Sequence, residues 1–350
     1  ARRSLEDARD LLAKVVGCHR SEVLFTSGGT ESDNIAIKGL YIQRNSEDAT
    51  RTVVISAGTE HHAGIDPVEW LEAQEGAESA WAPVSSNGLV DLAWLETYLG
   101  ENASRVALIS LMWVNNETGI ITPISEVTAL AAKYGIPVHS DAVAAFGHVP
   151  TNFATSGLAT MAISGHKLGS PVGIGALIVA RDAKVAVTSH GGGQERGIRS
   201  GTLSAPLAYT LAKAAALAEA EREELSVRLG EFKDQIVSAV KSAAPDADFT
   251  RGDQPGFAGI LHFTFPGCSG DSLLYLLDAA GISVSTGSAC RAGVAQPSHV
   301  IMAMGRSEHQ ARGSLRISLG YTTNQAEVDA FIQAFPVAYA GAHKAGLPSN

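Results

Sequence analysis

The pattern of hydrophobic and polar positions separates the chain into two regions, and the first of them alternates two kinds of segment. Between residues 20 and 200, short apolar runs alternate with segments whose apolar residues recur at helical spacing. The runs typical of strands are 23–26, 52–56, 106–111, 137–140, 160–163 and 173–180, and the helical segments are 32–41, 66–74, 92–99 and 124–134. This alternation predicts an α/β fold with a mostly parallel sheet covered by helices on both faces.

The second region begins with a long helix and continues with fewer strands. An Ala-, Glu- and Lys-rich helical stretch covers 203–243. Strand-like runs follow at 259–265, 282–285 and 314–319, with helical segments at 272–280 and 325–335. We therefore expect a large domain over residues 1–210, and a connecting helix with a small α+β C-terminal domain over 211–350.

The composition limits the class of protein. The 350-residue chain has 26 Lys and Arg against 36 Asp and Glu, a net charge of −10, which argues against a nucleic-acid partner. Its three cysteines, Cys18, Cys268 and Cys290, are too sparse for a disulfide framework and fit a reducing compartment. No apolar run approaches the ~20 residues of a membrane helix, and no signal peptide opens the sequence. We expect a cytoplasmic protein with no membrane partner.

A glycine-bearing turn is the first candidate binding site. Ser27-Gly28-Gly29-Thr30-Glu31-Ser32 lies between a predicted strand and a predicted helix. Glycines let the backbone approach an anion, and the start of a helix offers N–H groups to a phosphate. The alternative is an ordinary helix cap, because Thr30-x-x-Asp33 matches a capping pattern.

Two further polar motifs are expected at the carboxyl edge of the sheet. Asp141 directly follows the run 137–140, where a carboxylate can hold a proton on a heterocyclic nitrogen, although a helix cap explains it equally well. Ser164-Gly165-His166-Lys167 follows the run 160–163, and a desolvated lysine there can form a Schiff base. Most lysines are solvated surface groups, so the nearness of the two motifs favours a shared site more than either motif alone.

Seven motifs in order resemble those of the cysteine desulfurases, in the class V aminotransferase group of fold-type I pyridoxal-phosphate enzymes. They are Ser-Gly-Gly-Thr-Glu-Ser-Asp-Asn at 27–34, Thr-Glu-His at 59–61, Val-Asn-Asn-Glu at 114–117, Ser-Gly-His-Lys at 164–167, Arg-Ser-Gly-Thr at 199–202, Ser-Thr-Gly-Ser-Ala-Cys at 285–290 and Leu-Arg-Ile-Ser-Leu-Gly at 315–320. The resemblance covers essentially the whole chain. It implies an enzyme that converts L-cysteine to L-alanine with pyridoxal 5′-phosphate and passes the sulfur to an acceptor protein, such as an iron–sulfur cluster assembly scaffold.

The resemblance also implies roles for single residues at the cofactor. Lys167 would hold the cofactor covalently and move protons at the substrate, Asp141 would pair with the ring nitrogen, and His61 would stack on the ring and act in acid–base steps. The phosphate would be held by Gly29, Thr30, Ser164 and His166.

Three more residues would complete the site by the same resemblance. Thr202 would reach the phosphate in a neighbouring subunit, which implies a homodimer. Asn116, a cofactor and substrate contact, and Arg316 would bind the substrate carboxylate, Arg316 through two parallel N–H bonds. No metal site is expected, because His61 and His62 lack a third ligand with zinc spacing.

Cys290 is the expected sulfur carrier. Its surroundings, Cys290-Arg-Ala-Gly-Val-Ala-Gln-Pro-Ser298, are small and polar, which indicates an exposed loop, and Arg291 would favour the thiolate. The alternative is a small buried hydrophobic residue. Under the resemblance, Cys290 attacks the sulfur of bound cysteine and becomes a persulfide. Cys18 and Cys268 are expected to be bystanders.

Two departures from the family pattern keep other functions open. Ala144 stands where the family has a Gln that donates to the cofactor's phenolate oxygen. The chain starts at Ala1 within a helical pattern, so we expect a cut end that lacks the family's amino-terminal segment. Selenocysteine lyase activity and a non-catalytic binding scaffold are the alternatives.

Overall fold

The computed structural model describes residues 2–287 and 297–346, and the chain divides into two compact units. The first unit comprises Ala1–Pro83, Val90–Val114 and Thr122–Arg222, and the second comprises Val84–Leu89, Asn115–Ile121 and Glu223–Asn350. The division falls between Arg222 and Glu223, inside helix α7 (Ala205–Ala243). Two short segments from the first half of the chain also belong to the second unit, which the order of residues along the chain does not reveal.

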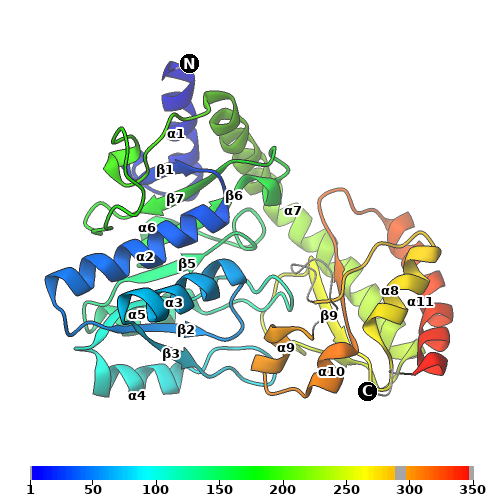
Figure 1. Ribbon diagram of the computed structural model, residues 1–350. Helices are drawn as coiled ribbons and strands as arrows, with labels where there is room; N and C mark the ends of the chain where they lie inside the picture. The colour runs from blue at the N-terminus through cyan, green and yellow to red at the C-terminus, as the bar shows by residue number, and fades with distance from the viewer. Residues whose placement is uncertain (1, 288–296, 347–350) are drawn as a thin grey trace. The chain divides into compact units, whose positions relative to one another are not determined.

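The first unit is built on a seven-stranded sheet in the order β1-β7-β6-β5-β4-β2-β3 (Figure 1). Its strands are β1 (Val23–Thr26), β2 (Val53–Ala57), β3 (Glu78–Ala82), β4 (Val106–Ser110), β5 (Val138–Asp141), β6 (Thr160–Ser164) and β7 (Gly175–Val179). Strands β2 to β6 pair in parallel, whereas β7 is antiparallel to both β1 and β6. The expectation of a mostly parallel sheet is therefore confirmed, with β7 as the antiparallel strand. The connection from β6 to β7 is too short for the crossover that parallel pairing needs.

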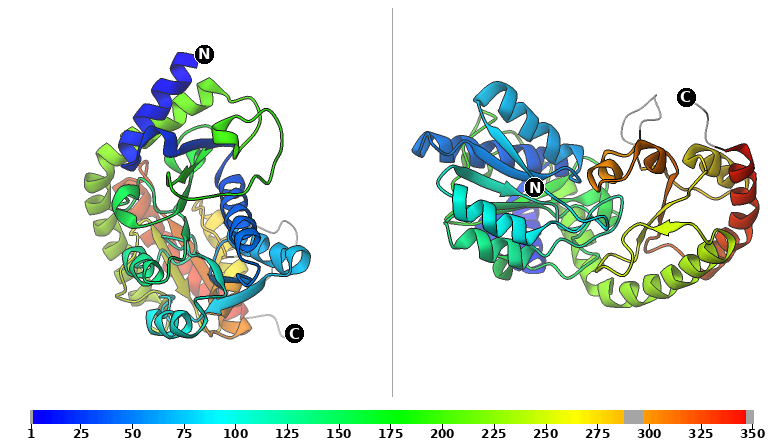
Figure 2. Two further views of the ribbon diagram at one scale, coloured as in Figure 1. Left: turned by 90° about the vertical axis from the view of Figure 1, so that its left-hand side faces the viewer. Right: turned by 90° about the horizontal axis from the view of Figure 1, so that it is seen from below.

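Helices cover the sheet on both sides (Figure 2). They are α1 (Arg2–Val16), α2 (Gly29–Glu47), α3 (His62–Glu75), α4 (Leu92–Asn102), α5 (Ile124–Ala132), α6 (Phe153–Ser156) and the first part of α7. On one side, Leu40 of α2 and Leu71 of α3 pack against Val54 of β2 and Leu108 of β4, all of them buried. Burial of such side chains stabilises the unit by about 1.5–3 kcal/mol each, and it fixes the start of α2 at the edge of the sheet.

The strand directions gather several loops at one edge. Because β1 and β6 are both antiparallel to β7, they run the same way as β5, β4 and β2. The segments that follow these strands all leave the sheet at its carboxyl edge, where ligands bind in open α/β folds.

The second unit contains a three-stranded antiparallel sheet in the order β10-β9-β8. Its elements are β8 (Asp248–Phe249), β9 (Ile260–Thr264), β10 (Ser314–Ser318), the end of α7, α8 (Gly270–Ala279), α9 (His299–Ala303), α10 (Glu308–Arg312) and α11 (Gln325–Ala345). The strand expected over 282–285 is wrong, since only Ser285 pairs, in an isolated bridge to Arg316. Among the described helices of both units, none has the length and apolar character to cross a membrane.

Candidate active site

The glycine-bearing turn begins helix α2 and leaves its first N–H groups available. The N-cap is Gly28, which makes no side-chain capping bond, so the alternative of an ordinary helix cap at Thr30 is wrong, and Thr30 lies inside the first turn. A Cβ at Gly29 would lie 2.6 Å from Val143 Cγ2, so only glycine permits this approach to the loop after β5. Uncapped N–H groups at the positive end of a helix suit an anion such as phosphate.

The Ser164–Lys167 motif adds hydroxyl and imidazole groups beside this turn. Ser164 ends β6, is 2% exposed, and its Oγ lies 2.8 Å from His166 Nδ1. A Cβ at Gly28 would lie 3.7 Å from Ser164 Oγ, so the turn and the hydroxyl are in contact. Partial desolvation and, secondly, the charge of Lys167 lower the pKa of His166. His166 and Lys167 are exposed side chains in the single chain.

Asp141 places a carboxylate next to this motif. It ends β5, which pairs with β6 in parallel, and it is 8% exposed. Its Oδ1 accepts a hydrogen bond from the Val143 N–H at 2.8 Å. Burial raises the pKa of Asp141 to about 6, while the Val143 hydrogen bond and the charge of Lys167 oppose that rise. The carboxylate is therefore ionised at neutral pH and can hold a protonated ring nitrogen.

His61 lies where the chain leaves β2 and begins α3. It is the N-cap of α3, and its Nδ1 accepts a hydrogen bond from the Ala63 N–H at 3.0 Å. A neutral ring whose Nδ1 is an acceptor carries its proton on Nε2. The cap thus fixes both the tautomer and the orientation of the ring.

Thr202 belongs to an irregular segment that two ion pairs hold on the first unit. Arg199 Nε lies 2.8 Å from Glu31 Oε1 in the first turn of α2. Arg9 of α1 donates from both terminal nitrogens to Glu195, at 2.9 and 2.7 Å. Thr202 itself is exposed.

Asn116 and Arg316 are brought together in the second unit. Arg316 Nη1 donates to the Asn116 carbonyl at 3.0 Å. Arg316 Nε and Asn116 Oδ1 are buried and have no hydrogen-bond partner within the described residues. Such atoms are expected where a polar ligand binds.

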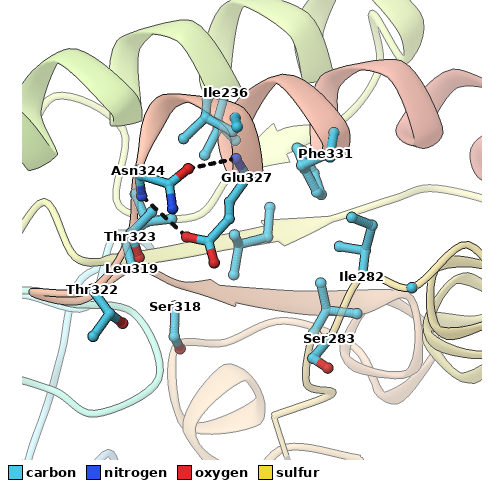
Figure 3. A pocket seen from close by; sticks show the side chains of 16 residues that line it. Ile236, Ile282, Ser283, Ser318, Leu319, Thr322, Thr323, Asn324, Glu327 and Phe331 are labelled. Carbon is cyan, nitrogen blue, oxygen red and sulfur yellow. Dashed lines mark hydrogen bonds between the residues drawn. The ribbon is translucent and has the colours of Figure 1, made fainter.

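A separate hollow of about 570 Å³ lies in the second unit (Figure 3). Ile236, Ile282 and Phe331 supply apolar surface, and Asn324 and Glu327 supply polar surface. These two residues form a capping box at the start of α11, with Asn324 Oδ1 accepting from the Glu327 N–H and Glu327 Oε2 from the Asn324 N–H. None of the predicted site residues lines this hollow.

The cysteines fall into two groups. Cys290 lies outside the described residues. Burial raises the pKa of the Cys18 thiol to about 12, and the fully buried Cys268 also has a raised pKa. A thiol that stays protonated is a poor nucleophile, in agreement with the bystander roles expected for Cys18 and Cys268.

Several residues of the quoted motifs have contacts that the sequence does not assign. Glu31, Glu60, Asp33 and Glu117 lie inside these motifs, and each binds a residue far away in the chain. Their presence in the motifs is the only signal in the sequence, since the distant partners are set by the tertiary fold.

The residues of the first unit fit pyridoxal phosphate. The uncapped turn with Ser164 and His166 offers donors to a phosphate, and the buried Asp141 suits a pyridinium nitrogen. Lys167 follows on the neighbouring strand end and supplies the amine that the aldehyde requires.

The chain is similar to known proteins over almost its whole length. The family described as "Aminotransferase class-V" matches residues 1–331. The IscS-like cysteine desulfurase of Mycobacterium tuberculosis is 48% identical over 348 residues, 99% of this chain and 88% of the relative. The cysteine desulfurase IscS of Dictyoglomus turgidum is 37% identical, over 93% of this chain and 81% of the relative. A solved structure titled NifS-like protein superposes with a TM-score of 0.86 at 31% identity, covering 97% of this chain and 88% of that one.

Proposed function

Because this chain belongs to the class-V aminotransferase family and, within it, to the cysteine desulfurases, we propose that it removes sulfur from L-cysteine, leaves L-alanine and carries the sulfur on Cys290. The family, the type I fold and the pyridoxal 5′-phosphate cofactor expected from the motifs are confirmed. The assignment of single residues, the persulfide, the homodimer and the cytoplasmic location are our proposal.

The arrangement of the first unit is the observation that carries the proposal. Gly29, Thr30, Ser164 and His166 would hold the phosphate. Asp141 would keep a proton on the ring nitrogen, because the ionised carboxylate lies at the end of a buried strand. When bound, pyridoxal phosphate supplies an electron sink for the electrons of a bond broken next to the substrate's amino group.

The protein's own side chains would then bind and deprotonate the substrate. Arg316, oriented by the Asn116 carbonyl, binds the substrate carboxylate together with the Asn116 side chain. The Lys167 amine attaches the cofactor and moves a proton at the substrate's α-carbon. His61, held by its cap to α3, stacks on the ring and presents the Nε2 edge for acid–base steps.

Sulfur transfer needs a thiolate on Cys290. Its sulfur attacks the sulfur of the substrate, a new S–S bond forms, and the C–S bond breaks with its electron pair left on carbon. A proton then completes L-alanine, and an acceptor protein removes the sulfur from Cys290. Free thiols at Cys18 and Cys268 agree with the reducing, cytoplasmic location that we infer.

Absorbance and product analysis test the proposal. The purified protein should be yellow and bleach with borohydride, and Lys167→Ala should abolish that bleaching. L-Cysteine should give alanine and sulfide, and Cys290→Ser should lose both products while keeping the colour. Selenocysteine lyase activity would instead survive in Cys290→Ser, and a binding scaffold would give colour without alanine.

A further inference from the structure

The buried carboxylate of Glu117 contacts residues on both sides of the segment that carries Cys290. Glu117 is 3% exposed and Ser298 is 2% exposed, and Ser298 Oγ donates to Glu117 Oε2 at 2.5 Å. The same oxygen packs against Gly287, because a Cβ added to this glycine would lie only 2.5 Å from it. One carboxylate oxygen therefore touches the chain at residue 287 and again at residue 298.

Each partner in this contact is fixed independently. Asn115 Oδ1 accepts from the N–H groups of Glu117 and Thr118, both at 2.9 Å, and from Thr118 Oγ1. Ser298 is the N-cap of α9 and accepts the Ile301 N–H at 3.3 Å. Helix α9 is anchored by the buried cluster Val300, Ile301, Met304 and Ala311. The contact thus joins two ordered elements.

The same turn holds Arg316. The Asn116 carbonyl accepts from Arg316 Nη1, and the backbones of Arg316 and Ser285 exchange two hydrogen bonds, at 3.0 and 2.6 Å. Ser285 lies two residues before Gly287. The contacts therefore form a closed ring within the second unit, from Arg316 through the turn at 115–118 to both ends of the segment, and through Ser285 back to Arg316.

We infer that Glu117 is a positioning residue for sulfur transfer, because it holds Gly287 and Ser298, on either side of the segment that carries Cys290, to the same turn that orients Arg316. This inference rests on the proposed function. Arg316 keeps its pairing with Ser285 and its place in β10 without Glu117, so substrate binding and sulfur transfer should respond differently to a change at this residue. A small misplacement of a reacting group lowers a rate far more than it lowers binding.

The test compares Glu117→Ala with Glu117→Gln, which keeps an oxygen that can accept from Ser298. In the cofactor-loaded protein, Glu117→Ala should slow persulfide formation on Cys290, followed by mass spectrometry, about tenfold or more. KM for L-cysteine should stay within about twofold, and Glu117→Gln should resemble the wild type. Ser298→Ala should also slow persulfide formation on Cys290. Its matched control is Ser269→Ala, which removes the N-cap of α8 without touching Glu117 and should transfer sulfur normally.

Hydrogen exchange of the cofactor-free protein gives a second readout. Glu117→Ala should speed exchange at amides 285–287 and 298–301, Glu117→Gln should not, and β9 should be unchanged. Wild-type persulfide rates in Glu117→Ala, a rise in KM that matches the loss of rate, or faster exchange in β9 as well would each overturn the inference. If wild-type protein binds cofactor but forms no persulfide, the proposed function fails, and the exchange result still decides whether Glu117 anchors the segment.

Discussion

Three buried carboxyl groups influence one another around the end of β5. Burial raises the pKa of Asp33 well above its usual value, and the charges of Asp141 and Glu60 raise it further. Burial raises the pKa of Glu60 to about 8, against the hydrogen bond from the Met112 N–H. Only Asp141 has a cation, Lys167, among the groups that set its pKa. Asp141 is therefore the first of the three to ionise, as a partner for a pyridinium nitrogen requires.

Asp33 is paired with a histidine beneath this site. Its Oδ1 lies 3.1 Å from His139 Nε2, and His139 Nδ1 lies 2.9 Å from Thr160 Oγ1. Burial lowers the pKa of His139 to about 3. Both shifts favour the neutral forms of Asp33 and His139, which limits the charge that this pair presents to Asp141.

The raised pKa of Glu60 predicts that the free energy of unfolding falls measurably as pH rises. Between 4.5, the ordinary pKa, and about 8, the unfolded chain ionises this group while the folded chain keeps its proton, so stability falls as pH rises through that window. Glu60→Gln keeps an acceptor for Met112 and should flatten the dependence by up to about 1.4 kcal/mol per pH unit. Urea unfolding of the cofactor-free wild type and Glu60→Gln at pH 5 to 8 measures how the free energy of unfolding depends on pH. If the free energy of unfolding changes with pH equally in both proteins, burial of Glu60 does not cause the dependence.

Ala144 predicts a shifted titration of the bound cofactor. It lies, half-buried, in the turn after Asp141, where the family has a glutamine donor. Supplying a donor to an anionic oxygen favours the anion by roughly 1.5–3 kcal/mol. Ala144→Gln should therefore move the cofactor's absorbance titration to lower pH. Ala144→Leu, which adds bulk without a donor, is the control, and an unchanged midpoint in Ala144→Gln would refute the idea.

Among the elements, the irregular segment that carries Thr202 is held to α1 and α2 by two ion pairs, Arg9–Glu195 and Arg199–Glu31. Glu195 and Arg196 have left-handed backbone, with φ of 43° and 59°, which non-glycine residues adopt only when their surroundings enforce it. Glu195 is buried, binds Arg9 through both oxygens, and accepts the Phe25 N–H at 2.7 Å. This carboxylate joins the segment to α1 and β1.

Removing Glu195 should be strongly destabilising. Glu195→Ala removes the bidentate partner of the largely buried Arg9 and leaves it the more exposed Glu6, whose Oε2 lies 3.7 Å from Arg9 Nε; breaking a buried ion pair typically costs about 3–5 kcal/mol. Replacing both partners, as Arg9→Met with Glu195→Gln, should recover part of that loss because no charge stays buried alone. Urea unfolding of the three proteins measures the difference. Glu47→Ala, which breaks an exposed pair with Lys184, is the surface control and should unfold like the wild type.

At the scale of the whole molecule, the proposed homodimer predicts complementation between two inactive variants. If Thr202 serves the neighbouring subunit, a hybrid of one Lys167→Ala chain and one Thr202→Ala chain contains one intact site. Co-expressed and purified through two different tags, that hybrid should recover about half of the wild-type activity, since one of its two sites is complete. Activity no higher than that of either parent would show that Thr202 acts within its own chain.

The sequence by itself determined the alternation of strands and helices, since burial periodicity is a property of neighbouring residues. It placed strands at β1, β2, β4, β5, β6, β7, β9 and β10, and it placed Asp141 and Lys167 just after two strands that are consecutive in the chain. It missed β3, whose residues Glu78–Ala82 have low strand propensity and are not uniformly buried. Its ordered motifs also identified the family.

Only the tertiary structure decided which distant residues meet. The antiparallel β7, the inclusion of 115–121 in the second unit, and the pairs Arg199–Glu31 and Ser298–Glu117 join segments far apart in the chain. Local periodicity tells which face of an element is buried, but not which other element covers that face. The pKa of Asp141 depends on the same long-range packing, because burial and the nearby Lys167 arise only once β5 and β6 lie side by side.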